Sequence, residues 1–143
     1  MQRLVSFNYK GLRQWGVMTT DGTAIIPAVE LEETYFIPLA ETMEEFIAMG
    51  EEGLLNLAQM LEMNKKEAVE AIPVSEVRIE VPFYPQRNIF CVGKNYPAHV
   101  KEFEKNPKAE VPENPVFFTK ATTSVIGPDD TINSYPDITS SVD

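Results

Sequence analysis

The sequence contains only one cysteine, Cys91, and only one histidine, His99. A single cysteine excludes an internal disulfide framework and any metal site built on paired cysteines. No apolar run approaches the ~18 residues that a membrane-spanning helix needs, and the first residues lack the apolar core of a signal peptide. Glycine-rich phosphate-binding motifs and the G-x-S-x-G motif of serine hydrolases are also missing. These absences predict a cytoplasmic protein with no membrane partner.

Positive charge is scarce as well. Lys and Arg total 12 against 22 Asp and Glu, so the formal net charge is −10. The excess lies in residues 28–80, which carry thirteen acidic and three basic residues. An acidic surface repels the phosphates of nucleic acids and anionic membranes, so we expect neither as a partner. The acidic stretch is typical of solvated helix faces, and an acidic docking patch is the alternative interpretation.

With 143 residues, of which 43% are hydrophobic, the chain can form one ordinary domain or two small ones. Alternation of apolar and polar residues predicts strands, and the turn signal Asp21-Gly22 joins the second and third into an antiparallel meander. The spacing of Thr42 and Glu45 is that of a capping box, which predicts the start of a helix. In this region the expected strands are 3–7, 15–19, 24–26 and 76–81, and the expected helices are 42–50 and 54–61, with a further helical turn or two in 65–72.

A domain boundary is predicted at Pro82-Phe83-Tyr84-Pro85, where two prolines fix φ within four residues. We therefore expect an N-terminal α+β domain over residues 1–81, a linker over 82–87 and a second domain that begins within 88–143. The run Asn88–Val92 is apolar throughout, which predicts a strand buried on both faces. The other elements expected here are a helix at 97–105, a loop at 106–115, strands at 116–120 and 124–126, and a tight turn at 127–130.

Residues suited to catalysis follow this expected strand. His99 and Glu102 are three positions apart, so on a helix they share one face and can hydrogen-bond. A carboxylate beside an imidazole fixes its tautomer and favours its protonated form, as a general acid–base pair needs. A solvated histidine on an exposed helix is the alternative. Lys120 ends an apolar strand, where its ammonium can bind a carboxylate or simply reach solvent. Cys91 is expected to be a buried, inert thiol.

Two longer strings occur in this order: NIFCVGKNYPAHVKE over residues 88–102 and PVFFTKATTSVIGPDDT over 115–131. Together they closely resemble the fumarylacetoacetate hydrolase superfamily, and more narrowly its bacterial acylpyruvate hydrolase and hydroxyheptadienedioate isomerase-type members. The usual family strings are C-V-G-x-N-Y-x-x-H-x-x-E, then a P-x-F-F-x-K-P-like strand, then a V-I-G-P turn. Ala121 departs from this pattern, because many relatives have proline there. Residues 1–83 are similar to the small N-terminal domain of the family.

The resemblance implies roles for single residues. His99 and Glu102 match the pair on a mobile lid helix that activates water in the hydrolases, and Asn95, Tyr96 and Lys120 match residues near the substrate pocket. The implied fold is a mostly-β catalytic β-roll, of which this chain holds the opening strands and the lid helix. The implied reaction is hydrolysis, decarboxylation or isomerisation of a small 2-oxo acid by a homodimer, and the sequence does not choose among the three.

The resemblance also implies a divalent cation, Mg²⁺ or in its place Mn²⁺ or Ca²⁺, held by an E-x-E strand and a later aspartate. The matching positions would lie beyond Asp143, so we expect no metal ligands in this chain and no turnover by it alone. The expectation is the front portion of a longer, truncated enzyme. The alternatives are a non-catalytic interaction module that keeps the front half of the fold, and self-association through exposed strand edges.

Overall fold

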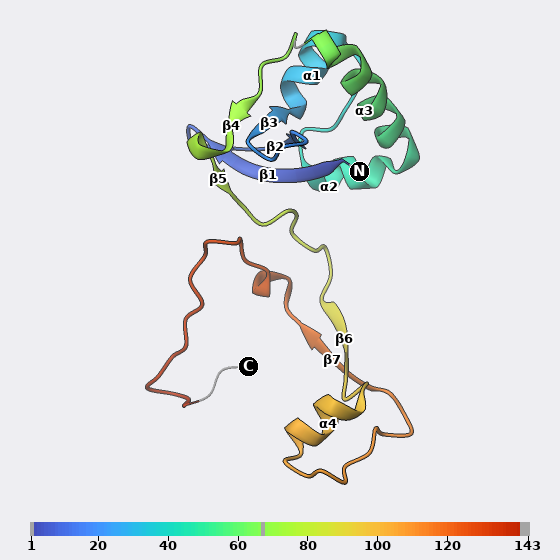
Figure 1. Cartoon of the computed structure of the whole chain (residues 1–143), viewed down its shortest axis with the longest axis vertical. Helices are drawn as coiled ribbons and strands as arrows, with labels where there is room; N and C mark the ends of the chain where they lie inside the picture. The colour runs from blue at the N-terminus through green and yellow to red at the C-terminus, as the bar shows by residue number, and fades with distance from the viewer. Residues whose placement is uncertain (1, 67, 141–143) are drawn as a thin grey trace. The chain divides into compact units, whose positions relative to one another are not determined.

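The computed structural model describes residues 2–66 and 68–140, which fall into two compact units. The first unit contains the residues up to Phe83 together with those from Ile126 onward, and the second contains Tyr84–Val125. Figure 1 shows the chain leaving the sheet of the first unit after β5 and running on into the hairpin and helix of the second. Both helices and strands are present, and the α+β class is confirmed.

An antiparallel sheet organises the first unit, with the strand order β4-β3-β2-β1-β5. The strands are β1 (Arg3–Tyr9), β2 (Leu12–Met18), β3 (Ala24–Pro27), β4 (Ile72–Pro73) and β5 (Arg78–Ile79). The first three form the predicted meander, and its register places Gly16 opposite both Val5 and Pro27. A strand expected over residues 76–81 is shorter, because Val74–Glu76 forms a 3-10 turn and only Arg78–Ile79 pairs with β1.

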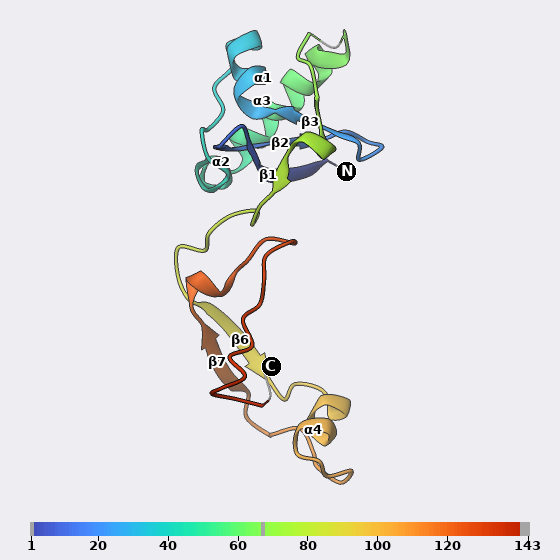
Figure 2. The ribbon, with the colours of Figure 1, turned by 90° about the vertical axis from the view of Figure 1, so that its left-hand side faces the viewer.

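Three helices cover one face of this sheet: α1 (Ala28–Tyr35), α2 (Met43–Met49) and α3 (Glu51–Met63) (Figures 1 and 2). Trp15 is central to the contact, because its indole N–H donates to the carbonyl of Ala40 at 2.8 Å and its ring lies 4.4 Å from that of Phe46. The opposite face carries a smaller apolar cluster around Phe7 and Ile25. The buried residues of the larger core are Trp15, Val17, Ala28, Leu31, Leu39, Met43, Phe46, Leu57, Met60 and Val69.

Local signals explain two of the helices. At α2 the capping box is confirmed, because the Thr42 hydroxyl accepts from the amide of Glu45 and the Glu45 carboxylate accepts from the amide of Thr42, both at 3.2 Å. Helix α3 contains the helix expected over 54–61, but its buried residues are Gly53, Leu57 and Met60, and Leu54 of the expected apolar stripe is 54% exposed. Helix α1 was not expected, although Ala28 and Leu31 stand three apart and are both buried. Among the described residues, the helices are too short or too polar to cross a bilayer.

The further helical turn expected over residues 65–72 is wrong apart from a 3-10 turn at Asn64–Lys66; Glu67 lies outside the described residues. The side chain of buried Asn64 provides the reason. Its carbonyl oxygen accepts from the Val69 amide at 2.8 Å and from the Tyr35 hydroxyl at 2.9 Å. Such side-chain bonds compete with the helical backbone pattern, and here they bring Val69 into the core.

Gly16 allows β2 and β3 to approach closely, since a Cβ placed on it would lie 2.3 Å from the carbonyl oxygen of Ile26. We predict that Gly16→Ala lowers the free energy of unfolding by about 1–3 kcal/mol, the usual cost of overpacking. Leu12→Ala on the same strand is the control, because Leu12 is 66% exposed and its loss should matter by less than about 0.5 kcal/mol. Urea unfolding followed by Trp15 fluorescence measures both; equal effects would contradict the steric explanation.

The β2–β3 turn is acid-sensitive at Asp21. Hydrogen bonds from the Thr19 hydroxyl and from the amide and hydroxyl of Thr23 lower the pKa of this carboxyl from 3.8 to about 2. Because the pKa is lowered, the ionised carboxyl stabilises the turn fully at pH values above 3.8. This stabilisation is lost as the pH falls towards the folded-state pKa of about 2. NMR titration should therefore give an Asp21 midpoint near 2, and Asp21→Asn should remove this transition; a midpoint at the ordinary value would exclude these bonds.

Candidate active site

The second unit is built on an antiparallel pair of strands, β6 (Ile89–Gly93) and β7 (Val116–Lys120). Both strands were predicted. Burial of β6 on both faces is wrong in the part of the chain that the structure describes, because Phe90 is 77% exposed and Phe117 of β7 is 65% exposed. Their side chains share one face of the pair, and β7 is the only described strand beside β6. Cys91, expected to be buried, is a free and half-buried thiol.

Helix α4 (Pro97–Phe103) follows β6 after a sharp turn. The turn is made at Lys94, whose φ of 51° lies in the left-handed region. Tyr96 is extended at the N-cap, and Pro97 suits the first helical position because its fixed φ is already helical and its missing N–H would have no helical partner. The predicted helix over residues 97–105 is thus confirmed, with its end two residues earlier than expected.

His99 lies on this helix and is half-buried. The ring of Tyr96 lies 5.2 Å from its imidazole, centroid to centroid, at a tilt of 35°. The next residue along the helix, Val100, is only 2% exposed. Glu102 is exposed, one helical turn after His99. The structure therefore brings Tyr96 and His99 into contact and places Glu102 on the solvent side of the same short helix.

An ion pair closes the helix against the end of β6. Lys94 Nζ contacts Glu104 Oε1, although the two residues are ten positions apart. Lys94 precedes α4 and Glu104 is its C-cap, so the pair spans the whole helix that carries His99. A helix of seven residues is too short to persist alone in water, so such attachments decide whether it forms.

Asn95 lines a hollow of about 170 Å³ between the end of β6 and the loop of residues 111–115. Lys94 and Glu113 line the same hollow, which gives it polar groups of both signs. Lys120 lies elsewhere. It pairs with Ile89, whereas Gly93 pairs with Val116, so Lys120 is at the far end of β7. The two ends are four residue steps apart along the strand, a length of about 13 Å.

The residues described do not form a metal site by themselves. Among them, no group of three or more His, Cys, Asp or Glu side chains is placed to hold a metal ion. Hard divalent cations such as Mg²⁺ need several oxygen ligands, mainly carboxylates. The residues present therefore do not fit the cation on their own, and the expectation that its ligands lie outside this chain stays a prediction.

Comparison with known proteins extends these observations. Residues 88–143, which include β6, α4 and β7, match the family model described as fumarylacetoacetate (FAA) hydrolase C-terminal. The fumarylacetoacetate hydrolase from the psychrophile Exiguobacterium antarcticum is similar in structure over 98% of this chain, with a TM-score of 0.61 and 26% identity. These matches show the resemblance to the fumarylacetoacetate hydrolase superfamily, in residues 88–143 by the family model and in the fold over most of the chain.

Curated relatives in this superfamily include oxaloacetate tautomerases. The chain is 36% identical over 104 residues to oxaloacetate tautomerase YisK of Bacillus subtilis, covering 69% of this chain and 34% of the relative. It is 30% identical over 137 residues to the mitochondrial oxaloacetate tautomerase FAHD2A of Bos taurus, covering 94% of this chain and 40% of the relative. The chain thus spans between a third and two fifths of the length of these two relatives.

Within the superfamily string, two contacts were missed by sequence reasoning. The Tyr96–His99 ring contact has a signal, because the two residues stand at the same three-residue spacing that pairs His99 with Glu102. The Lys94–Glu104 pair has no such signal in the sequence, since it depends on the left-handed turn at Lys94, which is a non-glycine residue. In the superfamily string this lysine occupies the position between glycine and asparagine that varies.

We predict that Lys94→Ala and Glu104→Ala each loosen α4, with amide hydrogen exchange in residues 97–103 about two- to fivefold faster, because each removes one partner of a partly exposed ion pair. The double exchange Lys94→Glu with Glu104→Lys should restore the original rate. Lys101→Ala is the matched control, since this lysine is exposed on the same helix. Equal exchange in all variants would show that the ion pair does not stabilise the helix.

Proposed function

We propose that this chain supplies the histidine-bearing helix of an enzyme that interconverts the keto and enol forms of a small 2-oxo acid. The placement of His99 carries the proposal: it is half-buried on α4, directly after β6, with the Tyr96 ring against it. Relatives named as oxaloacetate tautomerases support the choice of reaction and of substrate class.

Keto–enol interconversion removes a proton from the carbon next to the carbonyl and adds one to the carbonyl oxygen. The electrons of the broken C–H bond form the C=C bond, and those of the C=O π bond form the new O–H bond. Imidazole is suited to both transfers because its ordinary pKa lies near neutrality. We assign the transfers to His99. Contact with Tyr96 restricts the plane of the ring, and Glu102 follows one helical turn later on the same helix.

The neighbouring residues bind rather than react in this proposal. Asn95 lines the hollow beside β6, and a side-chain amide can donate a hydrogen bond to a substrate carboxylate or carbonyl. Tyr96 forms one wall beside the imidazole. Lys120 is at the other end of β7, so its proposed contribution is limited to balancing the negative charge of the substrate from a distance.

We propose this activity for a longer protein, because the chain spans only 34–43% of the length of the three related proteins named above. The divalent cation and the homodimer expected from the family belong to the same proposal. The described residues do not fit a cation on their own, so no step is assigned to one. We further propose that residues 1–143 alone show no turnover, because the relatives' sites are built on chains more than twice as long.

Hydrolysis of an acylpyruvate-type substrate is the second candidate, favoured by the likeness to a fumarylacetoacetate hydrolase. In that reaction the imidazole and carboxylate would remove a proton from water, and the water oxygen would attack the carbonyl carbon. A C–C bond then breaks, which tautomerisation leaves intact. Product analysis therefore separates the two candidates without reference to any single residue.

A chimera tests the proposal. The segment of the Bacillus subtilis relative that aligns with this chain is replaced by the corresponding residues of this chain, and decay of the enol of oxaloacetate is followed by its ultraviolet absorbance. We predict tautomerase activity that His99→Ala lowers by about 100- to 10,000-fold in kcat, the range for a lost general base.

Lys101→Ala, on the exposed part of the same helix, should leave the rate unchanged. An active chimera that is indifferent to His99→Ala would refute the assignment. A folded chimera that cleaves acylpyruvates and does not tautomerise oxaloacetate would favour the hydrolase. Turnover by residues 1–143 alone would contradict the proposal that the site needs a longer chain.

A further inference from the structure

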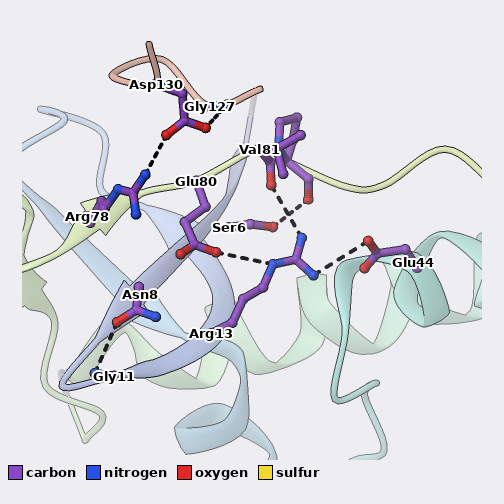
Figure 3. A network of polar contacts seen from close by, with 11 residues as sticks. Ser6, Asn8, Gly11, Arg13, Glu44, Arg78, Glu80, Val81, Gly127 and Asp130 are labelled. Carbon is purple, nitrogen blue, oxygen red and sulfur yellow. Dashed lines mark hydrogen bonds and ion pairs between the residues drawn. The ribbon is translucent and has the colours of Figure 1, made fainter. Parts of the chain in front are cut away.

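A cluster of polar contacts outside the candidate site joins the two places where the chain leaves and re-enters the first unit (Figure 3). It consists of Ser6 and Arg13 on the sheet, Arg78 on β5, and the turn from Gly127 to Asp130. We refer to these residues as the stem clamp. None of them has a part in the proton transfer proposed above.

The segment that leads out of the first unit, residues 80–82, is held by hydrogen bonds to the sheet. The Glu80 amide donates to the carbonyl of Ser6 at 2.9 Å, and the Ser6 hydroxyl, which is buried, donates to the carbonyl of Pro82. Arg13 adds a hydrogen bond to the carbonyl of Val81 at 3.4 Å and an ion pair with Glu80 at 3.4 Å. Val81 is itself 4% exposed, so the chain is fixed at this point before it enters the second unit.

The segment that re-enters the first unit, residues 127–130, is held beside Glu80 and Val81. Gly127 packs so closely that a Cβ on it would lie 3.3 Å from the nitrogen of Val81 and 3.5 Å from the carbonyl carbon of Glu80. The Asp130 carboxylate accepts from the Gly127 amide at 2.8 Å, which closes the turn, and its other oxygen pairs with Arg78 (Figure 3). These contacts lower the pKa of Asp130, the Gly127 amide first and Arg78 after it.

Along the chain, the clamp is almost equally far from the two strands of the hairpin. Ile89 pairs with Lys120 at the open end of the β6–β7 pair. Val81 precedes Ile89 by eight residues, and Gly127 follows Lys120 by seven. The segments from Val81 to Ile89 and from Lys120 to Gly127, which we call the arms, are thus nearly equal in length. A shift of register would make the arms unequal while their ends stay fixed.

We propose that Arg78 and Asp130 are positioning residues, which hold the two arms together and so stabilise the β6–β7 pairing that leads into α4. An isolated two-stranded hairpin is marginal in water, and joining its arms lowers the entropy that pairing must overcome. The proposed stabilisation of the hairpin by the clamp does not depend on which reaction the enzyme catalyses. Its effect on catalysis, through the helix that carries His99, rests on the function proposed above.

Hydrogen exchange of the 143-residue chain tests the clamp directly. We expect Arg78→Ala and Asp130→Ala to speed exchange in β6 and β7 by about two- to fivefold, the range for losing a partly exposed ion pair. Exchange in β1 and β2 should stay unchanged. Arg78→Lys should keep most of the protection because it keeps the charge, whereas Arg87→Ala, an exposed arginine between the clamp and β6, should have no effect.

Activity of the chimera described above gives the second measurement. Loss of positioning should lower kcat more than it raises KM, and Arg78→Lys should restore kcat. Unchanged exchange in the hairpin of both alanine variants would overturn the clamp whatever the reaction proves to be. Faster exchange together with an inactive chimera would retain the clamp and reject the proposed function.

Discussion

The arginine at position 13 makes the contacts on which the layout of the first unit depends. From β2 its guanidinium pairs with Glu44 of α2 at 3.6 Å and with Glu80 at 3.4 Å, and it also donates to the carbonyl of Val81. One side chain thus connects the sheet, a covering helix and the segment that leads out of the unit. A guanidinium suits this position because its donors point in several fixed directions at once, which a lysine ammonium does not match.

Much of the fold could be predicted because its signals are local. The meander follows from alternation and a turn dipeptide, and α2 follows from the Thr42–Glu45 capping box. The failures have non-local causes. The side chain of Asn64 bonds to Val69 and to Tyr35, which is 29 residues away, and so ends the expected helix. The strand expected at 124–126 is wrong, since residues 122–124 form a 3-10 turn in which both the amide and the hydroxyl of Ser124 bond to Ala121.

The candidate site could likewise be predicted only where the signals are local. Family strings single out the candidate residues His99, Glu102, Asn95, Tyr96 and Lys120 by position, yet they do not decide which of these side chains meet. In the structure Tyr96 contacts His99, and strand register carries Lys120 to the far end of β7. The Lys94–Glu104 pair depends on one residue with a left-handed backbone, which sequence spacing does not reveal. Motifs therefore suggested which residues to consider for the site, and strand register determined how far apart two of them lie.

The exposed hairpin has a consequence for the behaviour of the chain in solution. Acidic residues gather between positions 28 and 80, whereas Phe90 and Phe117, 77% and 65% exposed, belong to the other unit. The two units thus differ in composition, because one is rich in acidic residues and the other exposes large apolar side chains. Added salt screens the repulsion between the acidic units of different molecules. Strongly hydrated salts such as sulfate also strengthen the attraction between exposed apolar side chains. We therefore expect any self-association of the chain through the exposed hairpin to increase with ionic strength.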